Sequence, residues 1–136
     1  SYKVEGLGKT IIPDNVDFDV IDDFIKVTDR NSALRARALA RREGLMVGYS
    51  SGSAMEAVFK LRHQLKPSDV VVVLLPDHGS RYLGKIYNDE WMKQQGFLTQ
   101  SGEDVNPYSY HHMKRVYRVY RRKYGRYLRK TLLLNN

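Results

Sequence analysis

The chain has 136 residues, of which 42% are hydrophobic, and its formal net charge at pH 7 is +8. This length and apolar fraction suit one domain with a real core, and the lack of cysteine excludes a disulfide framework, a thiolate metal site and a cysteine nucleophile. The charge is uneven, because residues 1–100 hold 14 Lys/Arg against 13 Asp/Glu, whereas residues 101–136 hold 9 against 2. The basic character therefore belongs to the tail and not to the body of the chain.

The first 27 residues carry two extended patterns separated by an acidic loop. Residues 2–12 favour an extended segment interrupted by Gly6 and Gly8, and residues 24–27 alternate in the manner of a strand. No signal-peptide pattern is present, and the longest aliphatic run of the chain is too short to span a bilayer. We therefore expect a cytoplasmic protein, and the abrupt start without Met leads us to expect a fragment of a longer one.

Two helices and a short strand are predicted next. Thr28 is one of three candidate N-caps for a helix that ends near Gly44. Residues 45–47 favour a short strand and residues 48–53 a loop of Gly and Ser, after which an apolar pattern with helical spacing continues to about Leu65.

An aliphatic run at residues 70–75 is the clearest strand signal. Its β-branched residues are typical of a strand buried on both faces, and two short helices are expected between residues 82 and 95. Strands that alternate with helices predict an α/β fold with three layers, α/β/α, around a mostly parallel sheet. Ligands bind at the carboxyl ends of strands in such sheets, so the loops that begin at Gly6, Gly48 and Pro76 are candidate ligand loops.

The loop at residues 48–53 has two interpretations. A loop of small residues between a strand end and a helix start can direct backbone N–H groups and hydroxyls toward a ligand. Alternatively, Ser caps the helix and Gly relieves crowding, so that the loop only starts a helix. The spacing alone leaves both interpretations open.

The tail is predicted to be a separate element. Residues 99–106 are polar and rich in breakers, which is typical of a linker, and residues 107–136 favour a basic amphipathic helix. This helix could pack its tyrosine stripe on the body or on a second subunit, contact an anionic membrane or nucleic acid, or remain disordered. The sequence leaves these three alternatives open.

No metal site is predicted. His111 and His112 are adjacent, so on a helix they would point about 100° apart and would be poor joint ligands. His78 follows the aliphatic run, where it is either an ordinary loop residue or a contact to a substrate.

Several motifs occur in one order along residues 2–98. They are Tyr2-Lys3-Val4-Glu5-Gly6-Leu7-Gly8 with Ile12-Pro13, Glu43-Gly44-Leu45 with Gly48-Tyr49-Ser50-Ser51-Gly52-Ser53, Val72 to Pro76-Asp77, Arg81-Tyr82, Asn88-Asp89-Glu90-Trp91-Met92 and Gly96-Phe97. Together they resemble the C-terminal part of the catalytic domain of the cystathionine beta-synthases and of the related cysteine synthases. Both are fold type II pyridoxal-phosphate enzymes.

The resemblance implies a role for each matched loop. Ser50 matches the serine whose hydroxyl hydrogen-bonds the pyridine nitrogen of the cofactor. Gly6 and Gly8 match glycines that line the substrate and cofactor face, and Pro76 and Asp77 match the loop beside the cofactor ring. Residues 1–98 would then form a subdomain of the enzyme.

The resemblance also implies a reaction, the replacement of the β-substituent of serine or O-acetylserine by a thiol or sulfide in sulfur amino-acid metabolism. A serine at the pyridine nitrogen suits it, because a neutral hydroxyl donates a hydrogen bond but cannot keep a proton on the ring. Such a ring favours loss of a β-substituent over transamination or racemisation.

The family's Schiff-base lysine and Gly-rich phosphate loop lie upstream of the matched motifs. We therefore expect no catalytic residue in this chain, which alone would be inactive and would bind pyridoxal phosphate poorly. The expected partners are the missing N-terminal half of the enzyme, an amino-acid substrate and a second subunit in a homodimer. The alternative is a non-catalytic α/β binding module whose basic tail contacts polyanions.

Overall fold

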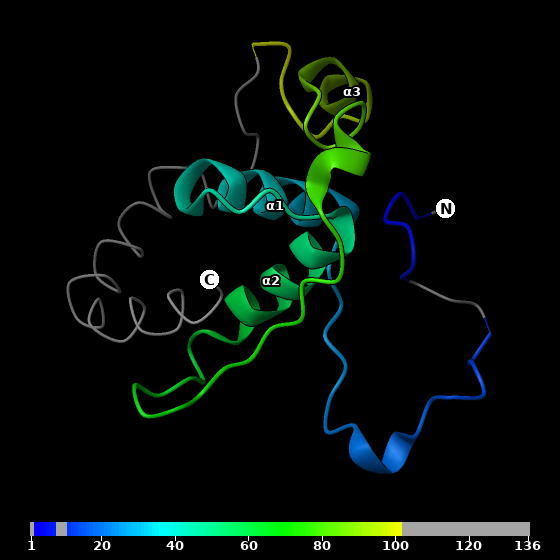
Figure 1. Cartoon of the computed structure of the whole chain (residues 1–136), viewed down its shortest axis with the longest axis vertical. Coiled ribbons are helices and arrows are strands. Elements are labelled where there is room, and N and C mark those ends of the chain that lie inside the picture. The colour runs from blue at the N-terminus through cyan, green and yellow to red at the C-terminus, as the bar shows by residue number, and fades with distance from the viewer. Residues whose placement is uncertain (1, 8–10, 102–136) are drawn as a thin grey trace.

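A computed structural model of the chain describes residues 2–7 and 11–101 (Figure 1). Its elements in chain order are the 3-10 helix η1 (Phe18–Val20), α1 (Asp29–Glu43), α2 (Tyr49–Leu61), the 3-10 helix η2 (Gly79–Tyr82) and α3 (Asp89–Gln94). Within these residues, no helix combines the length and the apolarity that crossing a membrane requires. Gly8, the predicted basic helix and most of the predicted linker lie outside the described residues.

α1 begins and ends at the capping residues that the sequence predicts. Thr28 is extended, and its hydroxyl oxygen accepts the backbone N–H of Asn31 at 3.2 Å, which satisfies one amide of the first turn. At the other end Gly44 has a φ of 70°, the left-handed conformation that commonly terminates helices. Thr28, one of the three candidate caps, is thus the N-cap, and the predicted end at Gly44 is confirmed.

α1 and α2 pack closely through small residues (Figure 1). A Cβ on Gly52 of α2 would lie 2.1 Å from the carbonyl oxygen of Ser32 and 3.0 Å from the Cβ of Ala36, so a larger residue does not fit. Beside this contact, the hydroxyls of Ser53 and Ser32 form a buried hydrogen bond of 2.9 Å. Small size at these positions therefore sets how near the two helices approach.

An ion pair joins the same two helices. The Glu56 carboxylate accepts hydrogen bonds from Arg35 Nε at 2.9 Å and Nη2 at 2.6 Å, and from Asn31 Nδ2 at 3.3 Å. The Arg35 guanidinium also lies over the ring of Phe59, with its central carbon 3.9 Å from the ring centroid. These partners satisfy a carboxylate that would be costly to bury unpaired.

The start of α2 packs against α3 through aromatic rings. The rings of Tyr49 and Trp91 meet edge to face, with centroids 6.5 Å apart. On the α1 side, Arg37 Nη1 donates to the carbonyl oxygen of the fully buried Ile86 at 2.9 Å, and Arg37 also pairs with Asp89 at the start of α3. α1, α2 and α3 therefore enclose one core.

The stretch at residues 48–53, predicted as a loop, is mostly helical. α2 begins at Tyr49 and ends at Leu61, earlier than the expected Leu65, and Gly48 is its N-cap with no side-chain capping bond. Gly and Ser are weak helix formers, but their small size permits the close contact with α1, and tertiary packing decides the conformation. The stretch therefore starts a helix, and its N-cap is Gly48 and not a serine.

The predicted parallel sheet is not found in the part of the chain that the structure describes. Residues 45–47 and 24–27, both predicted as strands, form no strand there. Val47 instead makes an isolated antiparallel bridge with His78. Of the two helices expected between residues 82 and 95, α3 is present, and the first is replaced by η2 followed by turns.

The aliphatic run at residues 70–75 is extended but exposed. Val70, Val72 and Leu74 are 90%, 88% and 80% exposed, so the predicted burial on both faces is wrong for this structure. A strand needs a neighbour to pair its N–H and C=O groups, and the described residues place none beside this run. Figure 1 accordingly draws it as a plain extended segment.

Candidate functional site

Two of the three candidate ligand loops meet at the start of α2. The N–H of Gly48 donates to the carbonyl oxygen of Asp77 at 2.8 Å, and the N–H of Gly79 donates to the carbonyl oxygen of Met46 at 2.8 Å. These two bonds flank the bridge between Val47 and His78. The loop after the aliphatic run is therefore fastened to the turn that leads into α2, through an antiparallel bridge and not through the predicted parallel sheet.

The Asp77 side chain lies against the N-cap of α2. A Cβ on Gly48 would lie 1.7 Å from Asp77 Oδ1, so any side chain at this position would displace the carboxylate. Asp77 Oδ2 accepts the hydroxyl of Tyr82 at 2.9 Å, whereas Oδ1 is buried without a hydrogen-bonding partner in the structure. A carboxylate at this point also faces the positive end of the α2 dipole.

Ser50 stands in the first turn of α2 and is half-buried. Its hydroxyl has no hydrogen-bonding partner among the described residues. Ser51, the next residue, is fully buried, and its hydroxyl is also unpartnered there. Because Gly48 provides no side-chain cap, the amides of this first turn have no capping side chain. The turn therefore combines N–H donors with a partly accessible hydroxyl.

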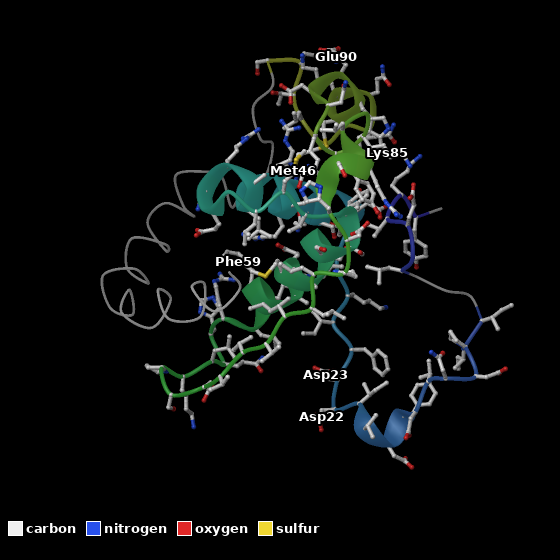
Figure 2. All side chains as sticks on the ribbon, viewed as in Figure 1. Asp22, Asp23, Met46, Phe59, Lys85 and Glu90 are labelled. Atoms are coloured by element: carbon white, nitrogen blue, oxygen red, sulfur yellow. The ribbon has the colours of Figure 1, made fainter. Side chains whose placement is uncertain are left out.

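The segment that carries Gly6 is fixed beside the other two loops. The backbone N–H groups of Lys3 and Val4 donate to the Asp29 carboxylate at 2.8 and 3.1 Å. Glu5 forms an ion pair with Lys85, which Figure 2 labels near this segment. Gly6 itself has a φ of 85°, a conformation that favours glycine. Residues 2–7 are therefore fastened both to α1 and to the turns after η2.

The structure brings some of the predicted site residues together and leaves others apart. Ser50 and Asp77 lie on segments joined by a hydrogen bond, and Gly6 lies on a segment bonded to the same body. Pro76 is exposed beside Asp77, and Gly8 is outside the described residues. His78 caps η2, because its Nδ1 accepts the N–H of Ser80 at 3.1 Å.

The structure adds two tyrosines that the sequence did not single out as site residues. Burial, and then the hydrogen bond to the Asp77 carboxylate, raise the pKa of Tyr82 to about 12. Burial, and then the Asp29 carboxylate, raise the pKa of Tyr49 as well. Both hydroxyls therefore stay protonated near neutral pH and act as donors, Tyr49 to the carbonyl oxygen of Asp29 at 2.9 Å. The spacing of Tyr82 from Asp77 matches no helix or strand period that could have flagged the pair.

No group of three or more potential His, Cys, Asp or Glu ligands for a metal gathers within residues 2–7 and 11–101. The acidic residues Asp22 and Asp23 lie between η1 and α1, away from α1, α2 and α3 (Figure 2).

Comparisons with known proteins agree with the motifs. The sequence profile of a family described as "Pyridoxal-phosphate dependent enzyme" matches residues 1–77. The chain is 40% identical to cystathionine beta-synthase of Rattus norvegicus over 111 residues, which cover 82% of this chain and 20% of the rat protein. It is 42% identical to cysteine synthase of Buchnera aphidicola over 83 residues, which cover 60% of this chain and 26% of that protein.

A solved structure of a hydrogen sulfide-producing enzyme is also similar, with a TM-score of 0.56 and 33% identity over 62% of this chain and 25% of that one. The chain thus spans about a fifth of the length of the cystathionine beta-synthases that it matches. The family resemblance expected from the motifs is confirmed: the chain belongs to the pyridoxal-phosphate dependent enzyme family, whose cofactor is pyridoxal phosphate.

Proposed function

We propose that residues 1–98 form one wall of the cofactor site of an enzyme that replaces the β-substituent of serine or O-acetylserine with a thiol or sulfide. The observation that carries this proposal is the Ser50 hydroxyl, which stands half-buried in the uncapped first turn of α2 and forms no hydrogen bond with residues 2–7 or 11–101. The similarity to cystathionine beta-synthases and cysteine synthases supports the same reaction class.

The residues present fit the cofactor at one end. Pyridoxal phosphate, when bound, supplies an electron sink for bond breaking at the α-carbon of an amino acid. Ser50 would donate its hydroxyl proton to the pyridine nitrogen in a neutral hydrogen bond. A serine hydroxyl is far too weak an acid to transfer that proton, so Ser50 would hold the ring while leaving it a weaker sink than a carboxylate would. This limited electron withdrawal favours loss of a β-substituent over transamination or racemisation.

Gly6 and Asp77 would complete this wall. Because Gly6 has no side chain, the backbone at this point would be able to lie close to the substrate. The carbonyl oxygen of Asp77 would hold the turn at Gly48 by accepting its N–H. Gly8 and Pro76 are proposed to line the same face. We place the lysine that holds the cofactor outside this chain, and propose that the chain alone neither binds pyridoxal phosphate tightly nor catalyses the reaction.

Serine variants of the protein that carries this chain test the proposal. Ser50→Ala is expected to lower turnover and to shift the absorbance of the bound cofactor, whereas Ser50→Asp is expected to raise side reactions such as transamination. The matched control is Ser51→Ala, which removes a neighbouring hydroxyl that has no partner in the structure and should change neither property. Unchanged rates and spectra in both Ser50 variants would rule the assignment out.

We also propose that the protein that carries this chain supplies the missing N-terminal half and a second subunit. Most aliphatic side chains of residues 70–75 are exposed, and this supports the proposal. An extended apolar run of this kind becomes stable when neighbouring strands of a sheet pair with it and cover it. Sedimentation of that protein at the mass of a monomer would contradict the homodimer.

Polyanion binding by the tail remains a separate prediction, since residues 107–136 lie outside both the family match and the described residues. The charge of residues 101–136 favours it, and binding of oligonucleotides or anionic vesicles that weakens with salt would support it.

A further inference from the structure

Tyr82 contacts the residues on the N-terminal side of Ser50 by two different routes. Its hydroxyl donates to Asp77 Oδ2 at 2.9 Å, and the same carboxylate lies against Gly48. The backbone carbonyl oxygen of Asp77 accepts the N–H of Gly48. Its ring meets the ring of Tyr49 edge to face, with centroids 6.5 Å apart and an angle of 84°. Gly48 and Tyr49 are the N-cap and the first residue of α2, and Ser50 follows them directly.

The surroundings of Tyr82 make this arrangement stiff. Tyr82 is buried, and it belongs to η2, whose start is fixed by the bond from Gly79 to Met46. Tyr49 is held on its other side by the ring of Trp91. A side chain held in one rotamer restricts the positions that its neighbours can adopt. Supporting residues orient the groups that touch a ligand in this way.

We propose that Tyr82 is a positioning residue for Ser50, which it orients through the Asp77 carboxylate and the start of α2. The inference rests on the proposed function, because Ser50 is taken to contact the pyridine nitrogen. Tyr82 itself donates to Asp77 and not to a ligand. Loss of its hydroxyl leaves a second oxygen of the carboxylate without a donor, so the Asp77 side chain turns toward water and away from Gly48. The carbonyl oxygen of Asp77 still accepts the N–H of Gly48, but the N-cap of α2 loses the carboxylate packed against it.

Tyr82→Phe is the direct test, because it removes the hydroxyl and keeps the ring. The matched control is Tyr87→Phe, since Tyr87 is partly buried nearby and donates its hydroxyl to the carbonyl oxygen of Val47 at 2.6 Å and not to the Asp77 carboxylate. Two readouts are measured on the protein that carries this chain. One is amide hydrogen exchange of residues 49–52 without cofactor, and the other is the dissociation constant and absorption spectrum with pyridoxal phosphate.

Tyr82→Phe is expected to speed exchange of these amides and to weaken cofactor affinity, each by about tenfold, together with a shifted cofactor spectrum. Tyr87→Phe should leave the affinity within about twofold. In an Asp77→Ala background, which removes the acceptor of the Tyr82 hydroxyl, Tyr82→Phe should add little, because the two residues act as one unit.

Equal effects of Tyr82→Phe and Tyr87→Phe would overturn the proposal, since they would indicate general loosening of the core. Additive effects of the Asp77 and Tyr82 substitutions would also overturn it. If Ser50→Ala leaves the cofactor spectrum unchanged while Tyr82→Phe still speeds exchange of residues 49–52, the proposed function fails and the coupling of Tyr82 to α2 stands.

Discussion

The sequence predicts apolar, core-forming patterns both for the α1–α2 pair and for the aliphatic run at residues 70–75. In the structure, α1 and α2 bury the residues at their contact, whereas most side chains of the run are exposed. In each of the two helices the backbone N–H and C=O groups pair within the helix, and small residues are buried where the helices touch. In the run, Val70, Val72 and Leu74 are exposed, and only Leu75 packs against the core. A helix can therefore form from nearby residues, whereas a strand depends on partners from elsewhere in the fold.

The largest expected effect is on the contact between the helices. Gly52→Ala places a Cβ 2.1 Å from the Ser32 carbonyl oxygen, so the helices must separate, and we expect a loss of about 3 kcal/mol in unfolding free energy. Chemical denaturation of the chain measures it. Gly84→Ala is the control, because a Cβ there meets nothing within 4 Å. A tolerated Gly52→Ala would show that the two helices do not meet as described.

The ion pair between the helices should be the next strongest contact. Glu56→Ala removes the acceptor of Arg35 and Asn31 from a buried position, with an expected loss of about 2–3 kcal/mol. Glu90→Ala is the matched control, since Glu90 is 74% exposed in its pair with Lys93 and should change stability by less than about 0.5 kcal/mol. Similar losses in both variants would contradict the buried role of Glu56.

The joint between α1 and α3 is expected to respond to pH. The hydrogen bond from Arg37, and then its charge, lower the pKa of Asp89 below its usual value. A lowered folded-state pKa adds stability that is present above about pH 4 and is lost as pH falls through the folded pKa. Because Asp89 is 60% exposed, we expect less than about 1 kcal/mol. Asp89→Asn should abolish this part of the acid dependence in denaturation curves measured from pH 2 to 7.

The smallest effect is expected in the aliphatic run. Val72→Thr should change the unfolding free energy of this chain by less than about 0.5 kcal/mol, because Val72 is exposed. Ile86→Val, a smaller change of a fully buried side chain, should cost about 1 kcal/mol. In the longer enzyme proposed above, a loss above 1 kcal/mol for Val72→Thr would indicate that the run is buried there.

The sequence predicted best the features that nearby residues decide. Thr28 and Gly44 mark the ends of α1 because capping depends on a few adjacent residues. The start of α2 was missed because Gly52 and Ser53 have low helix propensity, and only the distant α1 explains why small residues are needed there.

The sheet and the candidate site could be predicted only in part. Strand propensity identified residues 70–75 correctly as extended, but it cannot supply the strands that would cover them. Ser50, Gly6 and Asp77 came from a family resemblance, and the structure joins the loops of Ser50 and Asp77. The pairing of Asp77 with Tyr82 depends on the turn between them, so no sequence period could reveal it.

The attachment of the N-terminal segment to α1 has a consequence for how this protein can vary. The Asp29 carboxylate holds the amides of Lys3 and Val4, and Tyr49 holds the Asp29 carbonyl oxygen, so both ends of the stretch between Leu7 and Thr28 are anchored. Lengthening a loop between fixed ends costs only about 0.6 kcal/mol for each doubling. Insertions between residues 12 and 24 should therefore be tolerated without moving Gly6, which makes this stretch a natural place for relatives to differ in length or for a tag to be inserted.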